Sequence, residues 1–133
     1  MRKANWIVVA AWLGMLLLPD VALAAGPKKV VYPKELLGVW DVVPDQGRCK
    51  VSDEGSDVRF ELTPSRLIGY EDWAEPLSVV LISHRPKAWR IKSRLHIYEE
   101  AFEVYKIYSL PSKTDSVLAV VSSSQANVYD RCR

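Results

Sequence analysis

Short runs of β-forming residues recur along this chain, and they limit its fold more than any other feature of the sequence. Turn residues separate the runs at intervals of about 8 to 12 residues, a spacing typical of β-sandwiches and small barrels. The predicted strands are 39–43, 58–62, 66–70, 77–83, 89–98, 102–109, 117–122 and 128–132, after one helical turn at 34–37. We therefore expect an all-β fold, either a small antiparallel β-barrel of about eight strands or a sandwich.

The run 89–98 alternates most clearly. Its apolar phase is predicted to face the core and contains Trp89, Ile91, Leu95 and Ile97. The opposite phase forms a cationic stripe of Arg90, Lys92 and Arg94, continued by His96. If a tight turn at Glu100 and Ala101 joins this strand to the next, Ile97 faces Val104.

The first residues have the order of a secretory signal peptide. Two cations, Arg2 and Lys3, precede an apolar run at 6–18, and the small residues Ala22 and Ala24 follow. This pattern predicts cleavage after Ala24, which leaves one domain, 25–133, in the periplasm or secreted. The alternative, a retained membrane helix, needs about 20 apolar residues, more than this run contains. Ala25, and not a cysteine, stands directly after the predicted cut, so we expect no lipid anchor and no stable membrane anchor.

Both cysteines, Cys49 and Cys132, lie in the predicted exported domain, where an oxidising compartment allows thiols to pair. We therefore predict one disulfide between them. Closing a loop of about 83 residues would stabilise the fold by roughly 4.5 kcal/mol in the chain-entropy model. A metal site is the alternative, but two distant cysteines and two histidines lack the spacing of a zinc motif.

The charge of the predicted domain is nearly balanced. The full chain has 18 basic and 16 acidic residues, and the predicted signal peptide accounts for Arg2, Lys3 and Asp20. Nothing in this balance points to nucleic acid as a partner.

The segment 36–41, Leu-Leu-Gly-Val-Trp-Asp, resembles the first strand of the calycin superfamily, which includes lipocalins, avidins and small bacterial protease inhibitors. In lipocalins an arginine near the last strand covers the tryptophan of the first and closes one end of the barrel. The resemblance therefore implies that Arg131 covers Trp40, a contact that would contribute roughly 0.5 to 2 kcal/mol. It supports a fold and does not define a ligand.

We find no catalytic motif. The sequence has no Gly-x-Ser-x-Gly elbow and no His-Glu-x-x-His helix, so we predict a protein that is not an enzyme and has no cofactor. His84 and His96 would need a third ligand to hold zinc, and we predict no metal site. An undetected hydrolase would instead show titratable groups with perturbed pKa values converging in a cleft.

Two surface features are candidate binding sites. The cationic stripe would suit an acidic protein or an anionic envelope component, although Glu99, Glu100 and Glu103 on the next strand are placed to balance it. The segment 70–76 is predicted to be an acidic loop that exposes Tyr70 and Trp73. Trp73 would then either anchor an interface or cap the open end of the barrel.

We expect an exported, non-enzymatic binding protein that acts on another macromolecule, as an inhibitor or immunity protein. The alternative is a lipocalin-like carrier of a small apolar ligand. Trp40, Phe60 and Trp89 are predicted core residues, and with strands this short we expect side chains to fill most of the interior. The carrier hypothesis instead predicts a cavity of about 300 Å³ or more.

Overall fold

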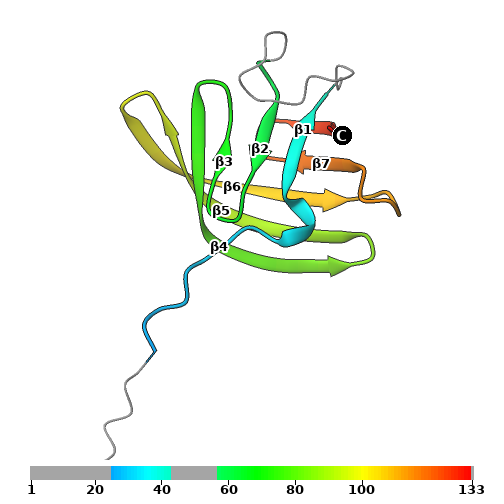
Figure 1. The fold of residues 1–133 in the computed structure, drawn as a ribbon, viewed down its shortest axis with the longest axis horizontal. Helices are drawn as coiled ribbons and strands as arrows, with labels where there is room; N and C mark the ends of the chain where they lie inside the picture. Colours follow the sequence, from blue (N-terminus) through cyan, green and yellow to red (C-terminus); the bar gives the residue numbers. More distant parts are fainter. Residues whose placement is uncertain (1–24, 43–56, 133) are drawn as a thin grey trace, which may run out of the picture.

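A computed structural model describes residues 25–42 and 57–132, and in these residues eight strands form one closed antiparallel β-barrel. Each strand pairs with the next, and β8 closes the barrel against β1. The elements are η1 (Lys34–Leu36, a 3-10 turn), β1 (Gly38–Asp41), β2 (Phe60–Leu62), β3 (Leu67–Ile68), β4 (Asp72–His84), β5 (Lys87–Ile97), β6 (Glu100–Leu110), β7 (Val117–Val121) and β8 (Ala126–Arg131). Figure 1 shows β1, β2 and β3 upright in front of β6 and β7, which lie across them. The all-β prediction is confirmed, and the architecture is a barrel.

The prediction of an acidic loop at 70–76 is wrong, because β4 begins at Asp72. Trp73 therefore lies in a strand, and it pairs with His96 of β5. Pro76 also lies within β4, where the register with β5 shifts between Pro76 and Ser78. A proline cannot donate to the ladder, and a bulge is a position where a strand tolerates that loss. The predicted strand 77–83 therefore began too late in the sequence.

The predicted turn between β5 and β6 is also wrong. Ile97 pairs with Glu100, and Val104 pairs with Ser93, so the turn is made by Tyr98 and Glu99. Tyr98 adopts a φ of 53°, the left-handed conformation that a two-residue hairpin turn requires and that usually favours glycine. The two registers differ by an even number of residues, so each side chain keeps its predicted face.

The core lies inside the barrel and is concentrated toward the end covered by η1. Trp40, Phe60 and Trp89 are buried as predicted. Around them pack Tyr32, Leu36, Leu62, Ile91, Tyr108, Leu110, Leu118 and Val120. Tyr32 and Leu36 precede β1, so the segment that enters the barrel contributes side chains that fill this end. We call it the closed end.

The opposite end, where β1 stops and β2, β4 and β8 begin, is called the open end. Its turns at 69–71, 98–99 and 122–125 connect neighbouring strands. No helix in the described ranges is long and apolar enough to span a membrane.

Two predictions fall on residues outside the described part of the chain. The predicted signal peptide, 1–24, is one, and Cys49 is the other. Cys132 follows β8, and its amide donates a hydrogen bond of 2.8 Å to the carbonyl of Val39. The bridge from Cys49 to Cys132 stays a prediction.

Candidate functional site

Arg131 and Trp40 form the centre of the closed end. The guanidinium carbon of Arg131 lies 4.2 Å from the centroid of the Trp40 ring, the arrangement that the calycin resemblance implies. Trp40 is fully buried, and its indole N–H donates a 2.9 Å hydrogen bond to the carbonyl of Leu36. The indole is thus covered on one face by a cation and held at its polar edge.

The guanidinium of Arg131 also joins three segments of the chain. It donates to the carbonyls of Glu35, Leu37 and Asp115, at 2.9, 2.6 and 2.9 Å. Gly38 has a φ of 127°, and a Cβ at this position would lie 2.9 Å from Nη1 of Arg131. The glycine two residues before Trp40 therefore makes room for the arginine, which gives the Gly-x-Trp pattern a steric cause.

Trp73, His96 and Arg94, three of the predicted surface residues, lie together on the outer wall of the barrel. The rings of Trp73 and His96 stack with centroids 3.7 Å apart and an interplanar angle of 2°. The guanidinium carbon of Arg66 lies 4.6 Å from the Trp73 centroid. Glu75 lies 3.6 Å from Nε2 of His96 and 3.7 Å from Nη1 of Arg94. Trp73 therefore contacts wall residues on both of its faces and does not cap the open end.

Tyr70, another predicted surface residue, lies apart from this wall cluster. It is 63% exposed on the turn between β3 and β4, at the open end.

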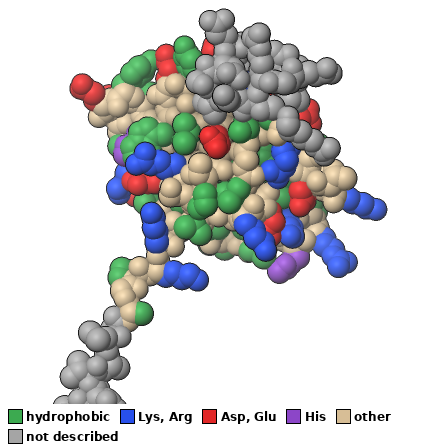
Figure 2. Space-filling model, in the orientation of Figure 1, with side chains coloured by type: hydrophobic (Ala, Val, Ile, Leu, Met, Phe, Trp, Pro, Cys, Tyr) green, Lys and Arg blue, Asp and Glu red, His purple; other side chains and the backbone are tan. Residues whose placement is uncertain are grey.

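The cationic stripe points outward, but acidic side chains flank it. Lys92 forms an ion pair with Glu103, and their hydrogen bond raises the pKa of the Lys92 ammonium. Arg94 is paired with Glu75 of β4. Arg90 is exposed and has no ion-pair partner among the described residues. Basic and acidic side chains are intermixed on the face shown in Figure 2, and no patch of a single sign stands out there.

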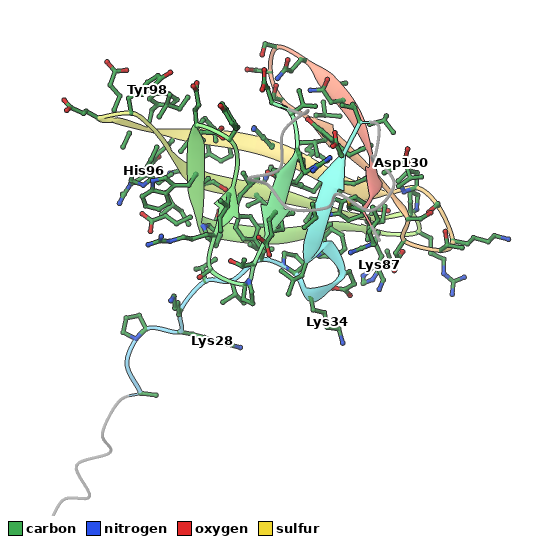
Figure 3. All side chains as sticks on the ribbon, turned by 45° about the horizontal axis from the view of Figure 1, so that its top comes forward. Lys28, Lys34, Lys87, His96, Tyr98 and Asp130 are labelled. Atoms are coloured by element: carbon green, nitrogen blue, oxygen red, sulfur yellow. The ribbon has the colours of Figure 1, made fainter. Side chains whose placement is uncertain are left out.

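The two histidines lie at opposite ends of the β4–β5 hairpin. His84 pairs with Lys87 beside the turn, whereas His96 pairs with Trp73. Figure 3 shows His96 with Tyr98 at one end of the molecule and Lys87 near η1 at the other. Within 25–42 and 57–132, no three histidine, cysteine, aspartate or glutamate side chains form a group that would hold a metal ion.

A cavity of about 340 Å³ occupies the open end of the barrel. Its apolar and aromatic walls include Phe60, Leu67, Tyr108, Val120 and Tyr129. Polar side chains from several strands and turns complete the lining: Asp57, Arg59, Asp72, Lys106, Gln125 and Asn127. The expectation of a filled interior thus describes the closed end and is wrong at the open end.

The buried polar groups around this cavity include one ion pair and two tyrosine hydroxyls. Nε of Arg59 lies 2.8 Å from Oδ2 of Asp41, and both side chains are almost completely buried. Burial strongly raises the pKa of the Tyr108 hydroxyl, with smaller contributions from Tyr32, Tyr129 and Asp72. Burial also raises the pKa of Tyr129. Both hydroxyls are therefore neutral at physiological pH and available to donate or accept hydrogen bonds.

The sequence analysis predicted such a cavity only under its alternative, the carrier hypothesis, although one signal in the sequence favoured it. In the strand 102–109, Phe102, Val104 and Tyr108 share a phase with Lys106. A lysine in the inward phase of a strand indicates a polar interior.

Comparison with protein-family models, with curated proteins and with solved structures finds no match to this chain. The class of this protein is therefore described from its fold and from the geometry of its site. Residues 25–42 and 57–132 form a closed eight-stranded antiparallel β-barrel with one end closed by Trp40 and Arg131 and a cavity at the other.

Proposed function

We propose that the protein is an exported, non-enzymatic binding protein that holds a small ligand in the open-end cavity. The observation that carries the proposal is the cavity of about 340 Å³. Sites for small molecules in proteins begin at about 300 Å³ and combine apolar walls with a few placed polar groups. The open-end cavity has both properties, so the geometry favours the carrier hypothesis over a barrel filled with side chains.

The ligand differs from the purely apolar molecule that the lipocalin resemblance suggests. Phe60, Leu67 and Val120 offer apolar surface, but Lys106, Asp72 and Asn127 line the same space. A wholly apolar ligand would bury these polar groups without hydrogen-bond partners, at a cost of about 1 to 3 kcal/mol each. The proposed ligand therefore has an apolar body and polar substituents. A lipocalin-like architecture, with one closed and one open end, supports this mode of binding.

The test compares two substitutions at neighbouring positions of β8. Asn127 lines the cavity, whereas Val128 is 59% exposed on the outer wall. The fluorescent probe is phenylnaphthylamine, a neutral aromatic amine, titrated into protein purified after expression of the full chain. We expect saturable one-site binding to the unchanged protein and to the matched control Val128→Trp. Asn127→Trp should abolish binding, because its indole would occupy the cavity.

Two results would overturn the proposal. One is the absence of saturable probe binding to the folded protein. The other is equal binding to the Asn127→Trp and Val128→Trp proteins, which would place the probe outside the barrel.

Export and the disulfide belong to the same proposal. The predicted signal peptide 1–24 would deliver the domain 25–133 to the periplasm or the medium, where Cys49 and Cys132 would be joined. Intact mass after alkylation without reductant would measure both features. We expect the mass of a chain that begins at Ala25 and carries no alkyl group. Two alkylated cysteines would refute the disulfide.

A second candidate function is binding to a macromolecule at the rim of the open end, as an inhibitor or immunity protein would. Tyr98, Tyr70 and Phe102 are 80%, 63% and 43% exposed at or near this rim. Exposed aromatic side chains are frequent anchors of interfaces. Capture from a periplasmic extract should then depend on Tyr98 and not on Tyr105, which is 59% exposed on β6. Equal capture by Tyr98→Ala and Tyr105→Ala would remove the rim from consideration.

A further inference from the structure

Among the described residues that line the cavity, Lys106 is a basic residue that has no acidic ion-pair partner there. It lies on β6 in the phase of the buried Tyr108, and it lines the open-end cavity. Its neighbours Tyr105 and Ile107 are exposed on the outer wall. In the described ranges no carboxylate lies within ion-pair distance of its ammonium group, whereas Lys87 and Lys92 each have one.

No other charged side chain described around the cavity forms an ion pair with Lys106. Arg59 is held by Asp41 in a buried ion pair. Asp72 lines the cavity and contributes to the raised pKa of Tyr108, but it forms no ion pair with Lys106. Asp57 is exposed at the mouth. Within the part of the chain that the structure describes, Lys106 and Asp72 therefore line the same cavity and form no ion pair with each other.

We infer that the ligand of the open-end cavity is a small organic anion whose carboxylate, sulfonate or phosphate group is bound by Lys106. The inference rests on the proposed function and specifies the chemistry of the ligand. Lys106 is a half-buried residue with no carboxylate partner in the described ranges, and a bound anion would supply the opposite charge. Tyr108, Tyr129 and Asn127 lie around the same cavity and offer hydrogen bonds to the remaining oxygen atoms of such a group. Asp72 suits a donor on the ligand, such as a hydroxyl or an amine.

The experiment uses two probes that differ in one group. Anilinonaphthalene sulfonate carries an anionic sulfonate, and phenylnaphthylamine has the same aromatic body without it. We expect the unchanged protein to bind the sulfonate probe more tightly. Lys106→Met should weaken sulfonate binding about tenfold or more and should not weaken phenylnaphthylamine binding, because only the sulfonate loses a charged hydrogen-bond partner. Retained phenylnaphthylamine binding shows that the variant is folded with its cavity intact.

Two further variants sharpen the test. Lys113→Met removes a lysine from the exposed 111–116 connection at the closed end and should change neither probe's affinity. Asp72→Asn removes the like charge from the cavity and should strengthen sulfonate binding. Lys106→Arg keeps a cation and should retain most of the preference for the sulfonate.

The outcomes separate the two proposals. If neither probe binds in the cavity, the proposed function fails. If phenylnaphthylamine binds and is lost in Asn127→Trp, but Lys106→Met weakens both probes equally or neither, the cavity binds ligands and the assignment of an anion to Lys106 is overturned.

Discussion

Replacing Arg131 with methionine should strongly destabilise the barrel, because this one side chain closes its end. Methionine keeps much of the apolar stem and removes the guanidinium. The change breaks the hydrogen bonds to the carbonyls of Glu35, Leu37 and Asp115 and the contact with the face of Trp40. The perturbation is therefore confined to one planar charged group with four identified contacts.

The magnitude follows from those contacts. A hydrogen bond contributes about 0.5 to 1.5 kcal/mol net, and three of them are lost. The cation–π contact adds about 0.5 to 2 kcal/mol. Arg131 is only partly buried, so water can reach some of the released carbonyls, and the sum lies toward its lower half. We expect a loss of about 3 kcal/mol in the free energy of unfolding, a large fraction of the 5 to 15 kcal/mol typical of a domain.

Urea unfolding followed by tryptophan fluorescence measures this loss. The midpoint should fall while the m-value stays constant, because the surface exposed on unfolding is unchanged. Arg90→Met is the matched control, since Arg90 is exposed on β5 and has no ion-pair partner in the described residues; it should cost less than about 0.5 kcal/mol. Arg131→Lys should recover little of the lost free energy of unfolding, because an ammonium group cannot reproduce the planar array of donors of a guanidinium. A loss below 1 kcal/mol for Arg131→Met would refute the role assigned to the closed end.

Two further predictions concern buried polar groups. Asp41→Asn should cost about 3 to 5 kcal/mol in urea unfolding, because it removes a carboxylate 2.8 Å from the buried Arg59 guanidinium, and Asp130→Asn at an exposed position should be nearly neutral. A loss below 1 kcal/mol for Asp41→Asn would contradict this. Burial raises the pKa of the Tyr108 and Tyr32 hydroxyls above their value near 10 in the unfolded chain. The stability that these neutral hydroxyls contribute is therefore complete below about pH 10 and is lost as the pH rises further. The urea midpoint should fall above about pH 10, and by less in Tyr108→Phe; equal falls would exclude Tyr108 as the cause.

The strand pattern of this barrel is readable from the sequence because each strand buries one face. Along β5 the inward Trp89 and Ile91 alternate with the outward Arg90 and Lys92, and that period of two reflects the backbone geometry itself. The turn at Tyr98 was missed because a tyrosine there adopts a backbone conformation that its type rarely favours. The conformational propensities of the residues therefore do not predict a turn at this position.

The sites were harder to predict, because they depend on which strands become neighbours. Trp73 and His96 stack only because β4 extends upstream past Pro76 and pairs with the end of β5. Glu75 reaches Arg94 for the same reason. The sequence placed acids from the following strand opposite the cationic stripe, and one of them, Glu103, does pair with Lys92. The pairing of Arg94 with Glu75, an acid on the preceding strand, was not predicted.

In the proposed function, the two ends of the barrel divide stability and binding between them. Trp40, Leu36 and Arg131 fill and fasten the closed end, so the residues of the open end are relieved of much of the packing that a domain of this size needs. Polar residues such as Lys106 and Asn127 interrupt the inward apolar phase, and a core built for stability alone would replace them with apolar side chains. Local rules of packing are commonly broken where a protein binds something. The departure of Lys106 from the inward pattern is therefore the feature of this chain that most directly points to its ligand.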